Sequence, residues 1–424
     1  MLNQVVGNVD LSRHVTVGLA GPLNVAFGTE YRRENYEIQA GEPDSYSDGG
    51  VPNQFGGRAA IGAQVFPGFR PSNEVNQSRD SIAGYVDVEG DVTTWLRFGA
   101  AGRTEHYSDF GSTVDGKLTS RLQPDRRFVL RGSVSTGFRA PSLAQSFFSS
   151  TATNFLNLGQ GLVPVEALTL PVSSAAAKAL GAEPLKPENS RHASAGVVIA
   201  PVSALDLTID YYRIAIDNRI VLSGNFTAAP IVALLAPFGA NSARFFTNAI
   251  DTRTNGVDVA ANYRLKLDAA GDLRLRAGYN NTRTRIVGSV ATPPQLAGFE
   301  SVLFDRLEQR RIECGQPRDS VRLGGDWRLN RFGVNVDVNR YGQYCSFTLN
   351  PADDQDYSPK WLTDLDASYQ VAGFALSVGA QNLFNVFPDR NSTVNSFNGI
   401  QTFPSQSPFG MNGRTFYARI GRRF

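Results

Sequence analysis

Long segments of this chain alternate between apolar and polar residues. In the clearest one, Phe332, Val334, Val336 and Val338 are interleaved with Gly333, Asn335, Asp337 and Asn339. Successive side chains of a β-strand point to opposite faces, so such a segment has one apolar and one polar face. The end of the chain repeats the pattern, and its apolar face holds Phe416, Ala418, Ile420 and Phe424. Strands of this kind suit a wall with hydrocarbon on one side and water on the other.

The alternation predicts fifteen strands, at residues 11–20, 23–38, 78–89, 94–107, 114–122, 127–137, 190–200, 204–217, 254–266, 272–287, 318–329, 331–345, 361–370, 374–382 and 414–424. Lengths near or above about ten residues are those of tilted membrane strands. Strands of soluble proteins average about half that length, which argues against a soluble β-sandwich.

Short and long connections follow one another along the chain. Turns such as 201–203, 268–271 and 371–373 carry the Gly, Pro, Asn and Asp residues that tight turns need. The connections between them are mostly long: 39–77, 138–189, 218–253, 288–317, 346–360 and 383–413. Short periplasmic turns and long extracellular loops are typical of Gram-negative outer-membrane barrels. The fold class we expect is therefore all-β, a transmembrane antiparallel β-barrel.

The strand count is odd, with the first and last strands running in the same direction. An antiparallel barrel closes only when these two strands run in opposite directions, so bacterial single-chain barrels have even counts. We therefore expect residues 1–424 to be a single barrel domain that is incomplete on its N-terminal side. The first residues show no basic start and no long apolar core, so no signal peptide is expected in this chain.

Composition excludes two other classes of protein. The net charge of +2 lacks the basic excess of a nucleic-acid-binding protein. No run reaches the ~18 apolar residues of a membrane helix. Lys is scarce beside Arg, which reflects either the codon usage of the genome or a lumen wall built from Arg–carboxylate pairs.

Several segments resemble TonB-dependent outer-membrane receptors. They are residues 105–111 (EHYSDFG), 135–143 (STGFRAPSL), 185–188 (LKPE), 248–256 (NAIDTRTNG) and 381–385 (QNLFN), together with the terminal Phe424. The residues that carry the family signature are Gly137, Phe138, Arg139, Ala140, Pro141, Asn382, Leu383, Phe384 and Phe424.

The resemblance implies a receptor for TonB-dependent uptake of an extracellular small-molecule ligand, often an iron–siderophore chelate. It also implies contact with outer-membrane lipid, and delivery by the barrel-assembly machinery through the C-terminal strand. Family members have barrels of about 22 strands with a plug in the lumen. No plug domain and no TonB-contacting box are recognised in this chain, so we expect that alone it is not competent for transport. The alternative is a passive porin-like or ligand-binding barrel without TonB coupling.

Cys314 and Cys345 are the only cysteines. They lie at nearly equal distances before and after the predicted turn near Asn330, and an antiparallel hairpin places such positions side by side. In an oxidising compartment this favours a disulfide. The alternative is a pair of free, buried thiols.

The signature around Arg139 could bind a ligand, but it also has a structural explanation. In that explanation Gly137 allows a bend and Pro141 ends the strand ladder. Arg139 then anchors the strand end to a carboxylate. Aromatic residues of the long loops include Phe226, Phe245, Tyr344 and Tyr357. Near strand ends such residues either cradle a ligand or form the upper aromatic girdle of the barrel, and elsewhere loop packing is favoured.

Catalytic and metal-binding patterns are missing from the sequence. We find no nucleophile elbow, no phosphate-binding loop and no His-Glu-x-x-His motif. His106, beside Glu105 and Asp109, is weak evidence for a metal site because adjacent strand residues face opposite ways. We expect no enzyme activity, no metal and no cofactor.

Overall fold

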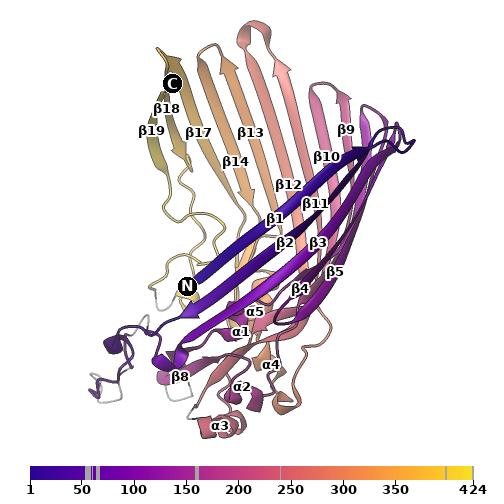
Figure 1. Ribbon diagram of the computed structural model, residues 1–424. Coiled ribbons are helices and arrows are strands. Elements are labelled where there is room, and N and C mark those ends of the chain that lie inside the picture. The colour runs from indigo at the N-terminus through magenta and orange to yellow at the C-terminus, as the bar shows by residue number, and fades with distance from the viewer. Residues whose placement is uncertain are drawn as a thin grey trace.

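A curved β-sheet forms the body of the molecule in the computed structural model, which describes residues 1–52, 59, 61–63, 67–157, 162–238, 240–396 and 399–422. Within these residues the sheet has 17 strands, and Figure 1 shows that it curls into a tall wall. All but two of its strands run through the wall: β1 (Leu2–Val15), β2 (Leu23–Ile38), β3 (Val75–Thr93), β4 (Leu96–Tyr107), β5 (Gly111–Asp125), β6 (Phe128–Arg139), β9 (Glu188–Val202), β10 (Leu205–Leu222), β11 (Ala243–Lys266), β12 (Asp272–Val287), β13 (Asp319–Leu329), β14 (Phe332–Tyr341), β17 (Lys360–Val371), β18 (Phe374–Gln381) and β19 (Thr415–Arg422).

Each wall strand pairs with the next one along the wall in antiparallel fashion, from β1 to β19. In the described part of the chain no ladder joins β1 to β19, and the wall stays open between them (Figure 1). Both strands run from the long-loop side to the short-turn side, so a direct ladder between them would be parallel. The predicted all-β antiparallel membrane fold is confirmed in strand direction and in the order of pairing.

All but one of the remaining elements belong to the connections on the long-loop side, the exception being the 3-10 turn between β11 and β12. β7 (Ser150–Asn157) and β8 (Leu162–Leu170) form a hairpin, and β8 pairs in parallel with the first residues of β11. β15 (Tyr344–Ser346) and β16 (Gln355–Tyr357) form a separate two-stranded sheet. The short helices are α1 (Leu143–Phe147), α2 (Ala175–Ala179), α3 (Ala229–Leu235), α4 (Glu300–Leu303) and α5 (Arg306–Glu313), with 3-10 turns η1 (Pro43–Ser45), η2 (Pro71–Asn73), η3 (Ala236–Phe238), η4 (Asp268–Ala270), η5 (Pro294–Leu296), η6 (Pro351–Asp353) and η7 (Val394–Ser396). None of the helices described is long and apolar enough to cross a membrane.

Several predicted strand boundaries were wrong, and three of them show why. The first strand was expected at 11–20, but β1 starts at Leu2 because β2 is long enough to pair with it as far as Leu2 opposite Tyr36. The segment 331–345 is divided into β14 and β15. β11 starts at Ala243 rather than at 254, since its first residues continue into the loop region and pair with β8.

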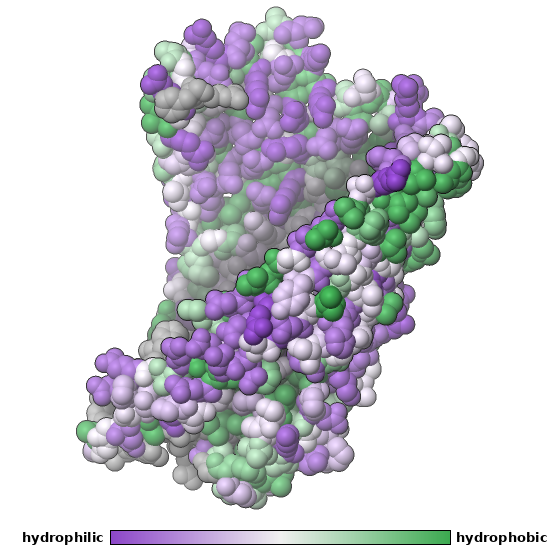
Figure 2. Space-filling model, viewed as in Figure 1, coloured by the Kyte–Doolittle hydropathy of each residue, from purple (hydrophilic) through white to green (hydrophobic). Residues whose placement is uncertain are grey.

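Most of the large exposed apolar side chains of the wall fall on one face of the sheet. Phe332, for example, lies opposite Tyr369 in the ladder, and both are exposed. The others on this face include Ile82, Val86, Phe98, Leu118, Leu130, Val134, Ile209, Tyr263, Leu275, Leu323, Trp361, Leu376, Val378, Phe416 and Ile420. Figure 2 shows hydrophilic residues on the inner surface visible through the opening, and hydrophobic residues along the outer surface at the right. The predicted sidedness, apolar toward lipid and polar toward the lumen, is present along the wall.

Ion pairs between Arg and carboxylates cross the polar inner face. Arg131 of β6 donates two hydrogen bonds to Asp210 of β10, at 2.9 and 2.6 Å. Arg276 of β12 lies 3.1 Å from a carboxylate oxygen of Asp337 on β14. The planar guanidinium matches a carboxylate with two donors, which a Lys ammonium cannot do.

Tight turns close the short-connection side. Asn330, between β13 and β14, adopts a φ of 53°, and Asn tolerates this left-handed region better than most residues. Gly271 has a φ of 88°, and a Cβ there would lie 2.1 Å from the carbonyl oxygen of Arg328. Glycine is therefore required at the turn that leads into β12.

Candidate functional site

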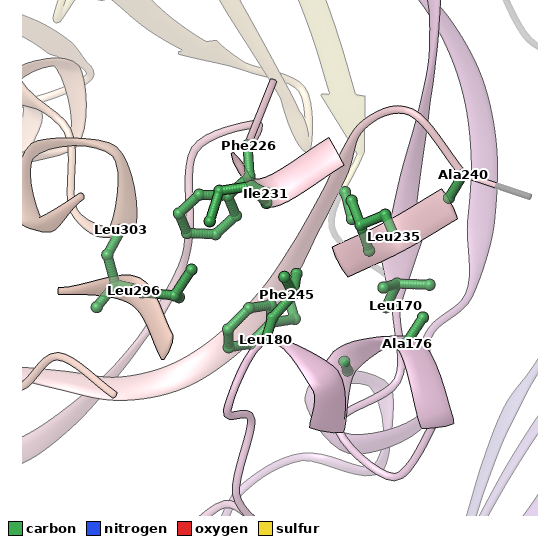
Figure 3. Close-up of a cluster of buried hydrophobic side chains, with 12 residues drawn as sticks. Leu170, Ala176, Leu180, Phe226, Ile231, Leu235, Ala240, Phe245, Leu296 and Leu303 are labelled. Atoms are coloured by element: carbon green, nitrogen blue, oxygen red, sulfur yellow. The ribbon is translucent and has the colours of Figure 1, made fainter. Parts of the chain in front are cut away.

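Three of the long loops lie at one end of the wall (Figure 1) and share an apolar core (Figure 3). Its fully buried side chains come from three loops that are distant in the sequence: Leu180, Phe226, Ile231, Leu235, Phe245, Leu296 and Leu303. Two short helices, α2 and α3, contribute residues to this core. Because each loop buries apolar surface against the others, the loops form one packed layer over this end of the wall.

Several of the loop aromatics belong to packed pairs. The rings of Phe226 and Phe245 stack with centroids 6.1 Å apart, and those of Tyr344 and Tyr357 with centroids 4.9 Å apart. All four residues are buried. Burial raises the pKa of the Tyr344 hydroxyl to about 12. Of the explanations that the sequence left open for these residues, loop packing is the one that the structure supports.

The signature residues around Arg139 tie three strands together at the loop side of the wall. Arg139, the last residue of β6, donates two hydrogen bonds to Glu188, at 3.0 and 2.6 Å. The same carboxylate accepts a hydrogen bond from the backbone N–H of Ile220 on β10, at 2.8 Å. Glu188 is buried at the start of β9. Gly137 lies within β6, and β6 ends before Pro141.

Arg79, which the sequence gave no reason to single out, is the most buried arginine of this region. Its side chain is 5% exposed and lies against Glu34 and Asp109. It also donates to the carbonyl oxygen of Pro141 at 2.6 Å, and its guanidinium lies 5.2 Å from the Tyr107 ring centroid. Glu34 faces Arg79 directly across the β2–β3 ladder, so the register of these strands was the only signal that could have revealed the pair. Arg79 thus holds the segment after β6 against β3.

The second signature segment forms a turn that is fixed by hydrogen bonds. Asn382 adopts a φ of 50°. Its side chain accepts a hydrogen bond from the N–H of Val386 at 2.8 Å and donates to the carbonyl oxygen of the same residue at 2.7 Å. The Leu383 N–H donates to the carbonyl oxygen of Thr363 at 2.7 Å, while the Phe384 side chain is exposed. Phe424, the terminal signature residue, lies outside the described residues.

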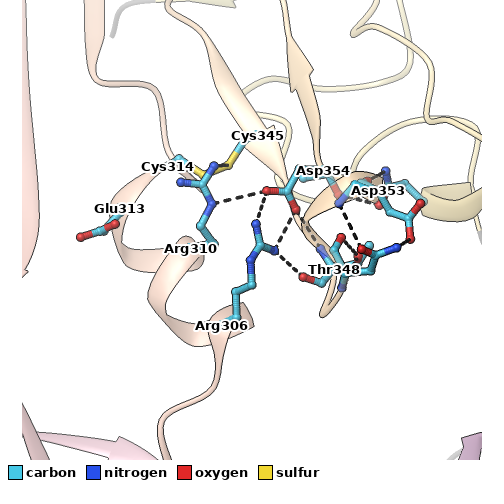
Figure 4. Close-up of polar contacts among 12 residues, drawn as sticks. Arg306, Arg310, Glu313, Cys314, Cys345, Thr348, Asp353 and Asp354 are labelled. Carbon is cyan, nitrogen blue, oxygen red and sulfur yellow. Dashed lines mark hydrogen bonds and ion pairs between the residues drawn. A yellow bond between two sulfur atoms is a disulfide. The ribbon is translucent and has the colours of Figure 1, made fainter. Parts of the chain in front are cut away.

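Cys314 and Cys345 form a disulfide with their Cα atoms 5.7 Å apart. Beside it, Asp354 binds Arg306 at 2.9 Å and lies 3.7 Å from Arg310, as Figure 4 shows. The hydrogen bond from Arg306 holds the pKa of the Asp354 carboxyl below its ordinary value. Two kinds of link, one covalent and one ionic, therefore clamp α5 to the loop that follows β14.

A polar cavity of about 530 Å³ opens between the loops. Its lining includes Lys178, Lys186, Asn248 and Gln295. Asn248 fixes the local backbone, since its side chain donates to the carbonyl oxygens of Lys186 and Asn218 at 2.9 and 2.7 Å and accepts from the N–H of Lys186 at 2.9 Å. Both lysine side chains are exposed. Glu183 also lines the cavity, 3.6 Å from the Lys186 ammonium. Ammonium groups on a rigid backbone can bind an anionic ligand.

Metal-binding groups of side chains do not occur in the part of the chain that the structure describes. No group of three or more His, Cys, Asp or Glu residues there is arranged to hold a metal ion. His106 makes a hydrogen bond to Ser112 at 2.9 Å, and His192 makes one to Ser190 at 2.9 Å.

Comparisons with known proteins agree with this architecture. The family model described as "TonB dependent receptor-like, beta-barrel" matches residues 2–383. None of the curated proteins compared matches the chain.

Solved structures with the same fold include the siderophore receptor PirA from Acinetobacter baumannii, at 15% identity and a TM-score of 0.64 over 99% of this chain and 54% of that one. A variant of the ferric enterobactin receptor PfeA from Pseudomonas aeruginosa, in complex with enterobactin, has 15% identity and a TM-score of 0.66, over 99% of this chain and 54% of that one. PirA from Pseudomonas aeruginosa has 14% identity and a TM-score of 0.59, over 99% and 56%. This chain thus spans about half the length of these receptors.

Proposed function

Because this chain belongs to the TonB-dependent receptor β-barrel family, we propose that it forms wall and loops of an outer-membrane receptor for energy-coupled uptake of a siderophore-type ligand. The family works in the outer membrane of Gram-negative bacteria, and the similar structures are receptors rather than enzymes. The observation that carries the proposal is the layer of long loops packed over one end of a lipid-facing wall. Such a layer offers a fixed surface to a ligand arriving from outside.

The cavity lined by Lys178 and Lys186 supports a negatively charged ligand. Catecholate groups around Fe³⁺ leave a chelate with net negative charge, which two ammonium groups would attract. The hydrogen bonds of Asn248 hold the backbone of Lys186 in place before any ligand arrives. Preorganisation of this kind lowers the entropic cost of binding.

Ligand binding by the refolded chain tests the proposal. Ferric enterobactin, a ferric hydroxamate and cyanocobalamin are to be compared by isothermal titration calorimetry in detergent. We expect a ferric chelate to bind, and the double variant Lys178→Ala, Lys186→Ala to weaken binding at least tenfold. Lys117→Ala, on the exposed part of β5 away from the loops, is the matched control. No binding by either ferric chelate would contradict a siderophore-type ligand.

We also propose that these 424 residues alone do not carry out energised uptake, because the wall stays open between β1 and β19 in the described part of the chain. The test is uptake of radiolabelled ferric chelate by cells that are given only this chain. Uptake that depends on the proton-motive force would refute the proposal that the chain alone does not transport. A stable single-channel conductance of the refolded chain would instead favour a passive pore.

A further inference from the structure

Five arginines form a patch on the outward face of four adjacent strands. They are Arg191 on β9, Arg213 on β10, Arg253 on β11, and Arg283 and Arg285 on β12. The ladders place them in two neighbouring rows: Arg191, Ala215, Arg253 and Arg285 form one, and Ala193, Arg213, Asn255 and Arg283 form the other. They share this face with the exposed apolar residues Ile209 and Tyr279, so they point away from the lumen.

The patch lies at the height where hydrocarbon meets headgroups on the loop side. Counted from the short-turn side, Arg213 is the ninth residue of β10 and Arg283 the twelfth of β12. A strand needs about 9–11 residues to cross the hydrocarbon core. The row formed by Ile209, Val259 and Tyr279, which lies nearer the short turns, is apolar. The arginines therefore lie at the outer edge of the apolar band, against the extracellular leaflet.

Positive charge in the patch exceeds what its own carboxylates neutralise. Asp217 bridges Arg191 and Arg253, at 2.8 Å to each. Arg213, Arg283 and Arg285 are exposed and have no ion-pair or hydrogen-bond partner among the residues that the structure describes. Unpaired arginine on the lipid face of a barrel is costly near the bilayer centre and is tolerated near the interface. A patch that keeps three such side chains is suited to an anionic partner.

Two recesses of the outer face meet at Tyr211. One, of about 320 Å³, is lined by Arg283 and Arg285 together with Asn255 and Asn281. The other, of about 420 Å³, is mainly apolar, and its lining residues include Phe98, Leu118, Val134, Ala193 and Ala195. Tyr211 lines both. The polar, basic recess thus continues along the wall into an apolar groove that spans the ladder rows of Tyr211 and Arg213.

We propose that this surface binds a phosphate-bearing lipid of the outer leaflet, with its phosphates on Arg213, Arg283 and Arg285 and an acyl chain in the groove beside Tyr211. Arginine suits phosphate because its planar guanidinium donates two parallel hydrogen bonds to it. The site lies on the outer face of the wall, apart from the loop cavity. It depends on the outer-membrane location, and it does not depend on which ligand the loops bind.

Lipid binding by the full chain in detergent tests this assignment, with bis-phosphorylated lipid A as the probe and its dephosphorylated form as the comparison. We expect wild-type protein to bind the phosphorylated form at least tenfold more tightly, and the affinity to fall as NaCl is raised. The triple variant Arg213→Gln, Arg283→Gln, Arg285→Gln should lose that preference. The matched control is the triple variant Arg264→Gln, Arg274→Gln, Arg328→Gln, which removes the same charge from the inner face. Its affinity for the phosphorylated lipid A should lie within twofold of the wild-type value.

Several results would overturn the proposal. One is equal affinity of wild-type protein for the two forms of lipid A, which needs no variant and so does not depend on variant folding. Another is unchanged binding by the outer-face triple variant. A third is competition by inorganic phosphate. If phosphate displaced bound lipid A as effectively as unlabelled lipid A does, the patch would be a site for free anions and not for a lipid. Because ferric-chelate binding is measured separately, failure of this proposal and failure of the proposed receptor function can be told apart.

Discussion

Replacing Glu188 with alanine tests how the loop side of the wall is held together. The variant loses two hydrogen bonds from Arg139, whose own side chain is 58% exposed. An ion pair with one solvated partner contributes about 1 kcal/mol. It also leaves the N–H of Ile220, a buried residue, without its acceptor, which costs about 1–3 kcal/mol. We therefore expect Glu188→Ala to lower the free energy of unfolding by about 2–4 kcal/mol.

The assay is equilibrium unfolding in urea with the protein in lipid vesicles, followed by tryptophan fluorescence. Glu188→Gln separates the two terms, since the amide oxygen still accepts from Ile220 while the charge is gone, and it should recover about half of the loss. Glu183→Ala is the control, because Glu183 is 76% exposed and its pair with Lys186 is solvated. Wild-type stability in Glu188→Ala, or an equal loss in Glu183→Ala, would refute the reasoning.

Three further predictions concern the loops. Replacing Cys314 and Cys345 with serine should cost about 4 kcal/mol through the entropy of the unfolded chain, and wild-type protein in reductant should then unfold at the same urea concentration as the variant. Leu180→Ala, at a fully buried site, should cost about 2–5 kcal/mol and open the loops to protease, whereas Leu234→Ala, at a site that is 40% exposed, should leave cleavage unchanged. Because Arg306 lowers the pKa of Asp354, the stabilisation from this ion pair is intact above about pH 4 and is lost as the pH falls below that value. A spin label in the 347–353 loop should therefore become more mobile below about pH 4. In the Asp354→Asn variant the same label should be mobile at every pH.

Local periodicity was enough to predict the wall. The alternation from Phe332 to Val338 sets both the strand and its outward face, and the left-handed turn at Asn330 fixes the hairpin. The same hairpin brings Cys314 and Cys345 together from nearly equal distances on either side. Each of these inferences needs only neighbouring residues and one turn.

The loop layer could not be predicted in the same way, because its contacts join distant parts of the chain. Leu180 and Leu303 share one apolar core although each belongs to a different loop. Arg79 reaches Pro141 only because β3 and the end of β6 lie at the same height in the folded wall. No sequence period encodes such contacts, and loop conformation follows from packing.

The outward arginines show the same limit. Each follows the alternation of its own strand, but Arg213 and Arg283 become neighbours only through the registers of β10, β11 and β12. A single-residue slip in one strand would move every side chain of that strand to the other face. A patch spread over several strands is therefore visible only once the register is known.

The orientation of alternate residues in β14 tests the central claim most directly. Single cysteines at Val334, Asn335, Val336 and Asp337, spin-labelled in lipid vesicles, report access to lipid-soluble oxygen and to a water-soluble nickel chelate. The account predicts that Val334 and Val336 favour oxygen while Asn335 and Asp337 favour nickel. Uniform access at all four positions, or the opposite alternation, would contradict a wall with hydrocarbon outside and water within.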